Sequence, residues 1–287
     1  MYPEKLEENP HRSWFGDDYL SSEIFAHCYI HENYIFKMHS HQFYEINIIT
    51  KGEGRHYIAD TYLPASVGDV FVIPPDVPHG YYTFDTLDIA HILLKKSFIN
   101  RYREELLQIP GYDLFFDIEP FIRQTSGLNY NLNMGIEQLN KIFKKIQYII
   151  DIENKSKHMY VNILVLSLIS EISAAFHKKV RHLSNESCED TELMNIMDFI
   201  KKNLDDKLSL HKIANYSNMS VATLNRRFND ILKISPMNYV INCRVQKAYE
   251  LLEENKYSKT EIAQLCGFYD LSHLNKYLSM KCLQKET

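Results

Sequence analysis

Residues 262–274 have the sequence IAQLCGFYDLSHL, which predicts a short helix, a tight turn, a capping residue and a second helix. An imperfect copy of this pattern occurs at residues 213–224. In both copies an isoleucine-alanine pair precedes a capping Ser or Asp and then a leucine. These positions are Ile213, Ala214, Ser220 and Leu224 in the first copy and Ile262, Ala263, Asp270 and Leu274 in the second. The sequence therefore predicts two helix-turn-helix units.

The second helix of such a unit lies in the major groove of DNA, with its N-terminal residues toward base edges. Leu224 and Phe228 are four residues apart and are expected to face the core, which leaves the polar positions between them for DNA. Arginine and asparagine form bidentate contacts with guanine and adenine, and a neighbouring arginine can contact phosphate. The candidate DNA-binding residues are Ala222, Thr223, Asn225, Arg226 and Arg227 in the first unit and Ser272, His273, Asn275 and Lys276 in the second.

Between the two units, Ser235 and Pro236 predict the start of a helix that continues to about Glu254. Such a rigid spacer would set two recognition helices about 34 Å apart, one turn of DNA. The alternative is that these polar positions form only the surface of a helical bundle. A single motif leaves the two interpretations about equal, whereas the repeat favours binding to double-stranded DNA.

These motifs resemble the AraC/XylS family of transcription regulators over nearly all of residues 194–278. The resemblance implies a two-lobed helical domain with one recognition helix per lobe, which often activates transcription by contacting RNA polymerase. After Leu278 the chain departs from the family pattern, because the Ser235-Pro236 motif of the first unit has no counterpart. We therefore expect a shortened second unit with a weaker hold on DNA. A regulator with impaired DNA binding that acts through protein contacts remains an alternative.

Short runs of β-forming residues separated by Gly and Pro predict a β-barrel or sandwich between about residues 35 and 94. Apolar residues at helical spacing then predict a helical hairpin over 139–150 and 161–176, either a dimer interface or a pair packed against the barrel. The predicted fold is a multi-domain α and β chain. Its parts are a cupin-like ligand-sensing domain at 1–120, a helical connector at 121–181, a linker at 182–191 and an all-α DNA-binding domain at 192–287.

The barrel segment contains a cluster of metal-binding residue types. Residues 39, 41 and 45 share one face of a strand, so two imidazoles and a carboxylate converge, and a later histidine can join them. This set suits zinc, iron, manganese or nickel. The candidate metal ligands are His39, His41, Glu45 and His79. A metal-dependent cupin enzyme with a helical appendage is the enzymatic alternative.

The HxH motif, Glu45 and His79 resemble a cupin barrel of the kind joined to AraC-type regulators, in which the same residues often form a polar sugar-type pocket or serve only a structural role. By this resemblance Tyr81 and His91 also face the effector, so the candidate effector-binding residues are His39, His41, Glu45, His79, Tyr81 and His91. Trp14 is expected to be a core residue rather than a stacking partner for a sugar. His27 and His56 carry no comparable signal.

Composition places the protein among globular chains of two domains. The 287 residues are 45% hydrophobic and carry a net charge of −5. Residues 190–287 hold 14 Lys and Arg against 12 Asp and Glu, which is +2, so the remainder carries −7. Five scattered cysteines, no signal peptide and no apolar run longer than Val161–Ile169 predict a cytoplasmic protein without a membrane segment.

Overall fold

The computed structural model divides into two compact units, Met1–Lys179 and Val180–Thr287, which are described separately. It describes residues 13–15, 20–32, 35–58, 61–83, 85–120, 123, 132–153, 158–183, 189–232, 234–254 and 256–283. The side chain of Trp14 lies outside this description, so its predicted core role stays a prediction.

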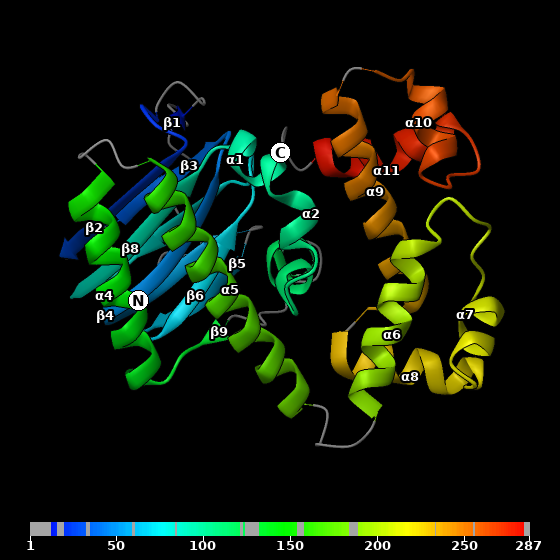
Figure 1. The fold of residues 1–287 in the computed structure, drawn as a ribbon, viewed down its shortest axis with the longest axis horizontal. Coiled ribbons are helices and arrows are strands. Elements are labelled where there is room, and N and C mark those ends of the chain that lie inside the picture. Colours follow the sequence, from blue (N-terminus) through cyan, green and yellow to red (C-terminus); the bar gives the residue numbers. More distant parts are fainter. Residues whose placement is uncertain are drawn as a thin grey trace. The chain divides into compact units, whose positions relative to one another are not determined.

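The first unit is built on β-strands (Figure 1). They are β1 (Ser13–Phe15), β2 (Ile24–Glu32), β3 (Ile35–His41), β4 (Tyr44–Ile58), β5 (Thr61–Ser66), β6 (Asp69–Ile73), β7 (His79–Tyr82), β8 (Thr86–Leu94) and β9 (Leu132–Asn133). Strand β4 joins two halves of the sheet, because its first half pairs with β6 and β8 and its second half with β5 and β7.

The sequence predicted two separate strands where the structure has the single strand β4. Gly52 lies between the two predicted runs, residues 45–50 and 55–58, and adopts a φ of +78° beside an irregularity in the pairing of β4 with β8. A Cβ at Gly52 would lie 1.8 Å from the carbonyl oxygen of Thr86, so a side chain is excluded there. Glycine thus bends the strand without ending it.

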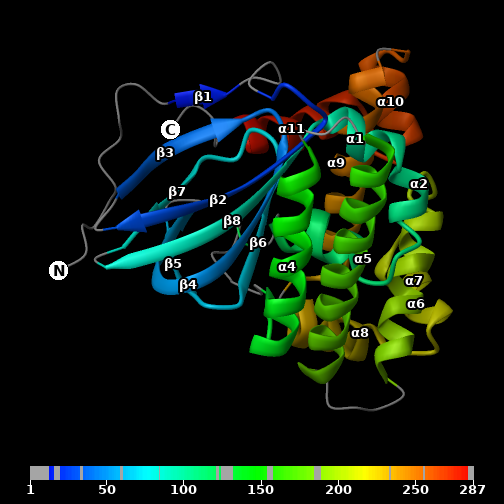
Figure 2. The same cartoon turned by 60° about the vertical axis from the view of Figure 1, so that its left-hand side comes forward.

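Helices follow the strands in the first unit. They are α1 (Lys96–Arg101), α2 (Arg103–Leu106), the π-helix η2 (Leu114–Ile118), α4 (Ile136–Glu153) and α5 (His158–Leu183). Helices α4 and α5 lie side by side as a hairpin (Figure 2), and Lys145 of α4 donates to Glu171 of α5. The predicted apolar stripes are largely buried inside the unit. Buried members are Leu139, Ile142, Ile146, Ile149, Val161, Val165, Leu168, Ile169, Ile172 and Phe176.

Helix α5 is longer than the interrupted apolar run suggested. Its segment Met159–Val180 is long and apolar enough to cross a membrane by length and composition alone. One face of this helix packs in the unit's interior, where Val165 and Ile172 are fully buried, as in a core helix. The helix also continues to Leu183 and α6 begins at Glu189, so helical structure enters both ends of the predicted linker at 182–191. Residues 184–188 lie outside the described residues.

The second unit is helical. Its helices are α6 (Glu189–Lys202), α7 (Leu210–Tyr216), α8 (Val221–Leu232), α9 (Pro236–Glu254), α10 (Lys259–Leu265) and α11 (Leu271–Leu283). Ser235 precedes α9 and its Oγ accepts a hydrogen bond from the backbone N–H of Asn238, as the Ser-Pro start predicted. The second helix-turn-helix has a core of its own. This core contains Val245, Ala248, Ile262, Ala263, Cys266, Phe268 and Leu274.

Candidate functional site

Three histidines converge on one buried carboxylate in the first unit. Glu45 is 4% exposed, and its Oε2 lies 2.8 Å from His41 Nε2 and 3.0 Å from His79 Nε2. Its other oxygen, Oε1, lies 2.6 Å from His91 Nδ1. Strands β3, β4, β7 and β8 supply these four residues, so the predicted cluster comes together only through the sheet.

The hydrogen bonds of the cluster keep Glu45 ionised. Burial alone would raise the pKa of Glu45, but the hydrogen bonds from His41, His79 and His91 outweigh it and hold that pKa well below its usual range. Burial lowers the pKa of His79, which favours its neutral form. His79 faces two acceptors, because Nδ1 lies 3.0 Å from the carbonyl oxygen of Val77 and Nε2 faces Glu45. A neutral imidazole has only one N–H for these two acceptors.

The donor set fits a divalent cation. The ligand atoms of His39, His41, Glu45 and His79 lie within 4.8 Å of one another, and all four residues are buried. In the tautomer that carries its hydrogen on Nδ1, His41 donates to the carbonyl oxygen of Phe43 over 2.8 Å and has Nε2 for a metal. Metal-binding histidines commonly hold their other N–H in this way.

His56 and Asn47 are buried polar residues beside this cluster that the sequence analysis missed. The ring of His56 stacks on that of Tyr81, and Asn47 Nδ2 donates to Tyr81 Oη over 2.9 Å. Three buried atoms of these residues have no hydrogen-bond partner among the described residues: Nδ1 and Nε2 of His56 and Oδ1 of Asn47. Alternation along β4 places residue 47 on the face of residue 45, a signal that the sequence did contain.

Each helix-turn-helix has the predicted cap and core. Ser220 Oγ accepts from the backbone N–H of Thr223 over 3.0 Å, and Asp270 Oδ1 accepts from that of His273 over 2.7 Å. The backbone N–H of Met219 donates to Ala214 and that of Phe268 to Ala263, so the two turns correspond. The second turn holds one additional residue, Tyr269, before its cap. The predicted core residues Leu224 and Phe228 are fully buried, and so is Leu274 of the second unit.

The candidate DNA-binding residues divide by exposure. Two pairs of equivalent positions on the recognition helices are exposed. Ala222 of α8 corresponds to Ser272 of α11, and Arg226 corresponds to Lys276. The remaining candidates are the half-buried Thr223, Asn225, Arg227 and His273 and the exposed Asn275. Asn225 Nδ2 donates to the carbonyl of Val221.

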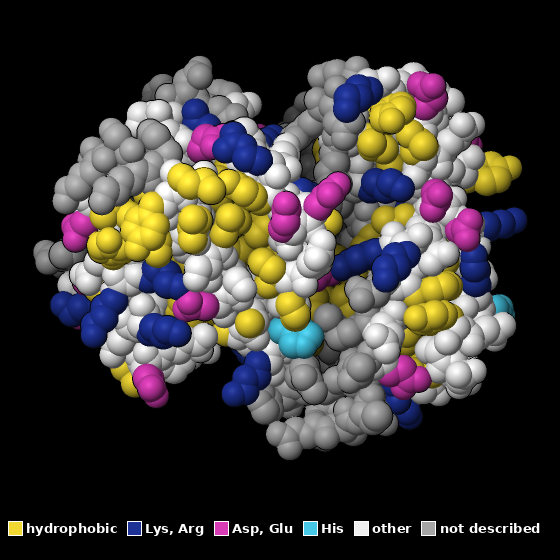
Figure 3. Space-filling view, in the orientation of Figure 1, with side chains coloured by type: hydrophobic (Ala, Val, Ile, Leu, Met, Phe, Trp, Pro, Cys, Tyr) yellow, Lys and Arg dark blue, Asp and Glu magenta, His cyan; other side chains and the backbone are white. Residues whose placement is uncertain are grey.

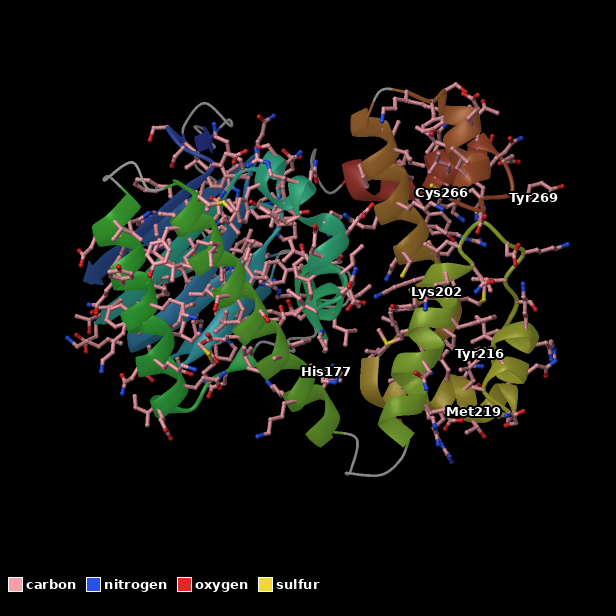
Figure 4. The ribbon with its side chains drawn as sticks, viewed as in Figure 1. His177, Lys202, Tyr216, Met219, Cys266 and Tyr269 are labelled. Carbon is pink, nitrogen blue, oxygen red and sulfur yellow. The ribbon has the colours of Figure 1, made fainter. Side chains whose placement is uncertain are left out.

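Two features of this surface escaped the sequence analysis. Arg227 Nη1 donates to Glu192 Oε2 of α6 over 2.7 Å. The guanidinium that was predicted to contact phosphate therefore forms an ion pair within the unit. Tyr269 is 92% exposed, and its side chain projects outward at the N-terminal end of α11 (Figure 4). The labelled Met219, just before α8, lies on the same side of the unit in that view. Tyr269 thus adds an exposed aromatic ring directly before the second recognition helix.

Two family models match the chain in the order of its two units. The AraC-like ligand binding domain matches residues 23–146, and a helix-turn-helix domain matches residues 213–281. The chain belongs to the AraC family of transcription regulators. The first range contains the Glu45 cluster, and the second contains both helix-turn-helix units.

Two curated relatives and one solved structure are similar to the chain over most of its length. The transcriptional activator RhaR of Shigella dysenteriae is 22% identical over 267 residues, which is 90% of this chain and 89% of RhaR. The activator RhaS of Salmonella schwarzengrund is 22% identical over 84% of this chain and 82% of RhaS. The structure of ToxT from Vibrio cholerae has a TM-score of 0.40 and 12% identity, covering 91% of this chain and 94% of ToxT.

These findings confirm the predicted AraC-type regulator with an N-terminal cupin-like domain, connecting helices and a helical DNA-binding domain. They place the chain among DNA-binding regulators rather than metal-dependent enzymes. Its partners are accordingly DNA and a small ligand.

Proposed function

We propose that this regulator activates transcription in the cytoplasm in response to a small polar effector, a sugar or sugar derivative. The observation that carries the proposal is the set of buried polar atoms around Tyr81. His56 and Asn47 hold three such atoms without partners in the described structure, and each costs about 1–3 kcal/mol when left unsatisfied. Hydroxyl groups of a sugar can supply the missing partners. The activator names of RhaR and RhaS support activation.

The charge of the Glu45 cluster favours an uncharged sugar over an acidic one. Glu45 is buried and ionised, and an anionic ligand beside it would meet a like charge with little screening. The rings of Tyr81 and His56 supply flat surfaces for the apolar faces of a sugar. The effector site comprises the predicted His39, His41, Glu45, His79, Tyr81 and His91, with Asn47 and His56 in addition.

A thermal-shift screen of the full chain against neutral sugars and their phosphates tests this proposal. A ligand bound only by the folded state stabilises it by about 2.7 kcal/mol at a hundred times its Kd. We expect neutral sugars to raise the Tm and Asn47→Ala to abolish that rise. Asn140→Ala, at an exposed position of α4, is the control and should keep it. Stabilisation by sugar phosphates alone would contradict an uncharged effector.

On DNA, we propose that the predicted residues of α8 and α11 contact the major groove, with Tyr269 as an additional contact of the second unit. Its exposed ring can pack against a thymine methyl group or a sugar. Selection from a randomised duplex library should return two half-sites for the full chain. Tyr269→Ser should weaken the preference in the second half-site and leave the first unchanged. Tyr257→Ser, another exposed tyrosine of this lobe, is the control.

A metal at the Glu45 cluster is a second proposal, supported by the convergence of four buried ligand atoms from His39, His41, Glu45 and His79 within 4.8 Å of one another. Metal analysis and zinc titration of the full chain test it. We expect one tightly bound ion per chain, lost in His79→Ala and retained in His211→Ala, which changes an exposed histidine. If the chain binds no zinc, manganese, nickel or iron, the proposed metal site is contradicted.

We also propose that the chain forms a homodimer and contacts RNA polymerase. An exposed apolar area covers α4 and α5 (Figure 3), where Met159 is 70% and Ile163 51% exposed. The other large exposed apolar residues of these helices are Ile136, Tyr148 and Tyr160. Ile163→Asp should shift a dimer to monomer in sedimentation experiments. The buried residues of the predicted stripes, such as Ile142 and Ile169, pack within the unit, so the proposed interface uses the exposed residues of the same helices.

A further inference from the structure

The guanidinium of Arg244 joins the two lobes of the DNA-binding unit. Arg244 lies in α9, is 6% exposed, and donates from Nε to the carbonyl oxygen of Leu204 over 3.0 Å. Its Nη2 donates to the carbonyl oxygen of Asp206 over 2.8 Å. Both carbonyls belong to the turn between α6 and α7, so the spacer helix is tied to the first lobe through two bonds from one planar group.

The turn of the second helix-turn-helix packs against the same two residues, Leu204 and Arg244. Gly267 has a φ of +77°, and a Cβ there would lie 2.0 Å from the carbonyl oxygen of Leu204 and 2.7 Å from Arg244 Nη2. The carbonyl of Leu204 thus contacts both the spacer helix and the second turn. Residue 267 directly follows Cys266, which is buried in the core of the second lobe and labelled in Figure 4.

The equivalent turn of the first unit shows that the requirement for glycine comes from the packing of Gly267 against Leu204 and Arg244. Asn218 occupies the corresponding position with a φ of +52°, and its side chain is exposed. Asparagine is tolerated in this left-handed conformation. The conformation of the turn therefore does not by itself demand glycine. The second unit needs glycine because Leu204 and Arg244 fill the space of a side chain.

We propose that Arg244 is a positioning residue that fixes the second recognition helix relative to the first, and so sets the half-site spacing that one chain recognises. The inference rests on the proposed binding of two half-sites. Both helices must enter successive major grooves, so a change of angle at this junction moves α11 out of register with the second groove. Lysine cannot replace the guanidinium here, because a single ammonium group lacks its rigid fork of donors.

The test measures spacing rather than affinity. The full wild-type chain selects duplexes from a library randomised over more than two helical turns, and its preferred site is compared with versions whose half-sites are moved by one base pair. We expect the wild type to bind the moved sites at least about tenfold more weakly. Arg244→Lys should bind original and moved sites within about threefold of each other. Lys247→Arg, on the same helix, should keep the wild-type ratio.

The ratio of two affinities measured on one preparation does not depend on the fraction of folded protein, so partial unfolding of Arg244→Lys does not obscure the result. A variant that weakens both sites equally and keeps the wild-type ratio would overturn the positioning role. Selection of a single half-site by the wild type would overturn this inference together with the binding of two half-sites. Only the first of these outcomes leaves the proposed function intact.

Discussion

The imidazole ring of His56 lies parallel to the ring of Tyr81, with centroids 4.5 Å apart and planes inclined by 9°. His56 is fully buried, and its edge also meets Phe71. Burial, and then the charge of Arg123, lower the pKa of His56 well below its usual value, so the ring is neutral in the folded chain. A neutral histidine in this position makes the first unit sensitive to acid.

His56→Phe should reduce the acid sensitivity of folding. The unfolded chain takes up a proton at His56 below about pH 6.5, whereas the folded chain does so only at its lowered pKa. Stability is therefore fully present above about pH 6.5 and is lost below it, by up to about 1.4 kcal/mol per pH unit from this group. Calorimetry at about pH 7.5 and about pH 5.5 should show a smaller loss for the variant. His211→Gln, at an exposed position, should behave as wild type; an equal loss in all three chains would contradict the assignment.

The sequence predicted the cluster around Glu45 but not the residues that surround it. The HxH spacing and Glu45 lie close together in the chain, so alternation along a strand was enough to group them. Asn47 and His56 both lie on β4, and predicting two strands there concealed their relation. Gly52 bends β4 so that its two halves pair with different strands, and this pairing depends on contacts far apart in the sequence.

Glu45→Leu should destabilise the first unit by about 3–5 kcal/mol. The substitution removes the carboxylate that His41, His79 and His91 face, and it leaves those buried polar groups without their acceptor. Chemical denaturation of the full chain measures the loss. Glu53→Leu removes an exposed carboxylate from the same strand and should change stability by less than about 0.5 kcal/mol. Similar losses in both variants would contradict a central role for Glu45.

In the DNA-binding unit, the sequence predicted the recognition helices because helical spacing, caps and core residues are local signals. It did not predict the pairing of Arg227 with Glu192, since the two residues are 35 positions apart. The junction at Arg244 was missed for the same reason, because Leu204 and Asp206 are loop residues whose carbonyls leave no trace in the sequence pattern.

Arg226→Ala and Arg227→Ala should affect DNA binding in different ways. Arg226 is exposed on α8, so its loss should cost about 1–3 kcal/mol at the selected site and relax the preference at one base pair. Arg227 is paired with Glu192, and we expect it to exchange that carboxylate for a DNA phosphate, so its loss should weaken binding to all sequences alike and lower the salt dependence by about one ion. Fluorescence anisotropy over a range of salt concentrations separates the two effects. Lys144→Ala removes a charge outside this unit and should change neither; equal behaviour of both arginine variants would refute the division.

Gly267→Asn should destabilise the second unit although asparagine occupies the equivalent turn of the first. Asn218 has a φ of +52° with an exposed side chain, whereas a Cβ at Gly267 would lie 2.0 Å from the carbonyl oxygen of Leu204. We expect a loss of more than about 1 kcal/mol for Gly267→Asn and little change for Asn218→Gly, since glycine adopts this conformation without strain. Gly135→Ala is the control for an added methyl group, because a Cβ there meets nothing within 4 Å. Thermal melts should show the lowest Tm for Gly267→Asn, with Asn218→Gly and Gly135→Ala close to the wild type. A Tm of Gly267→Asn equal to that of the wild type would contradict the close packing of the second turn on Leu204.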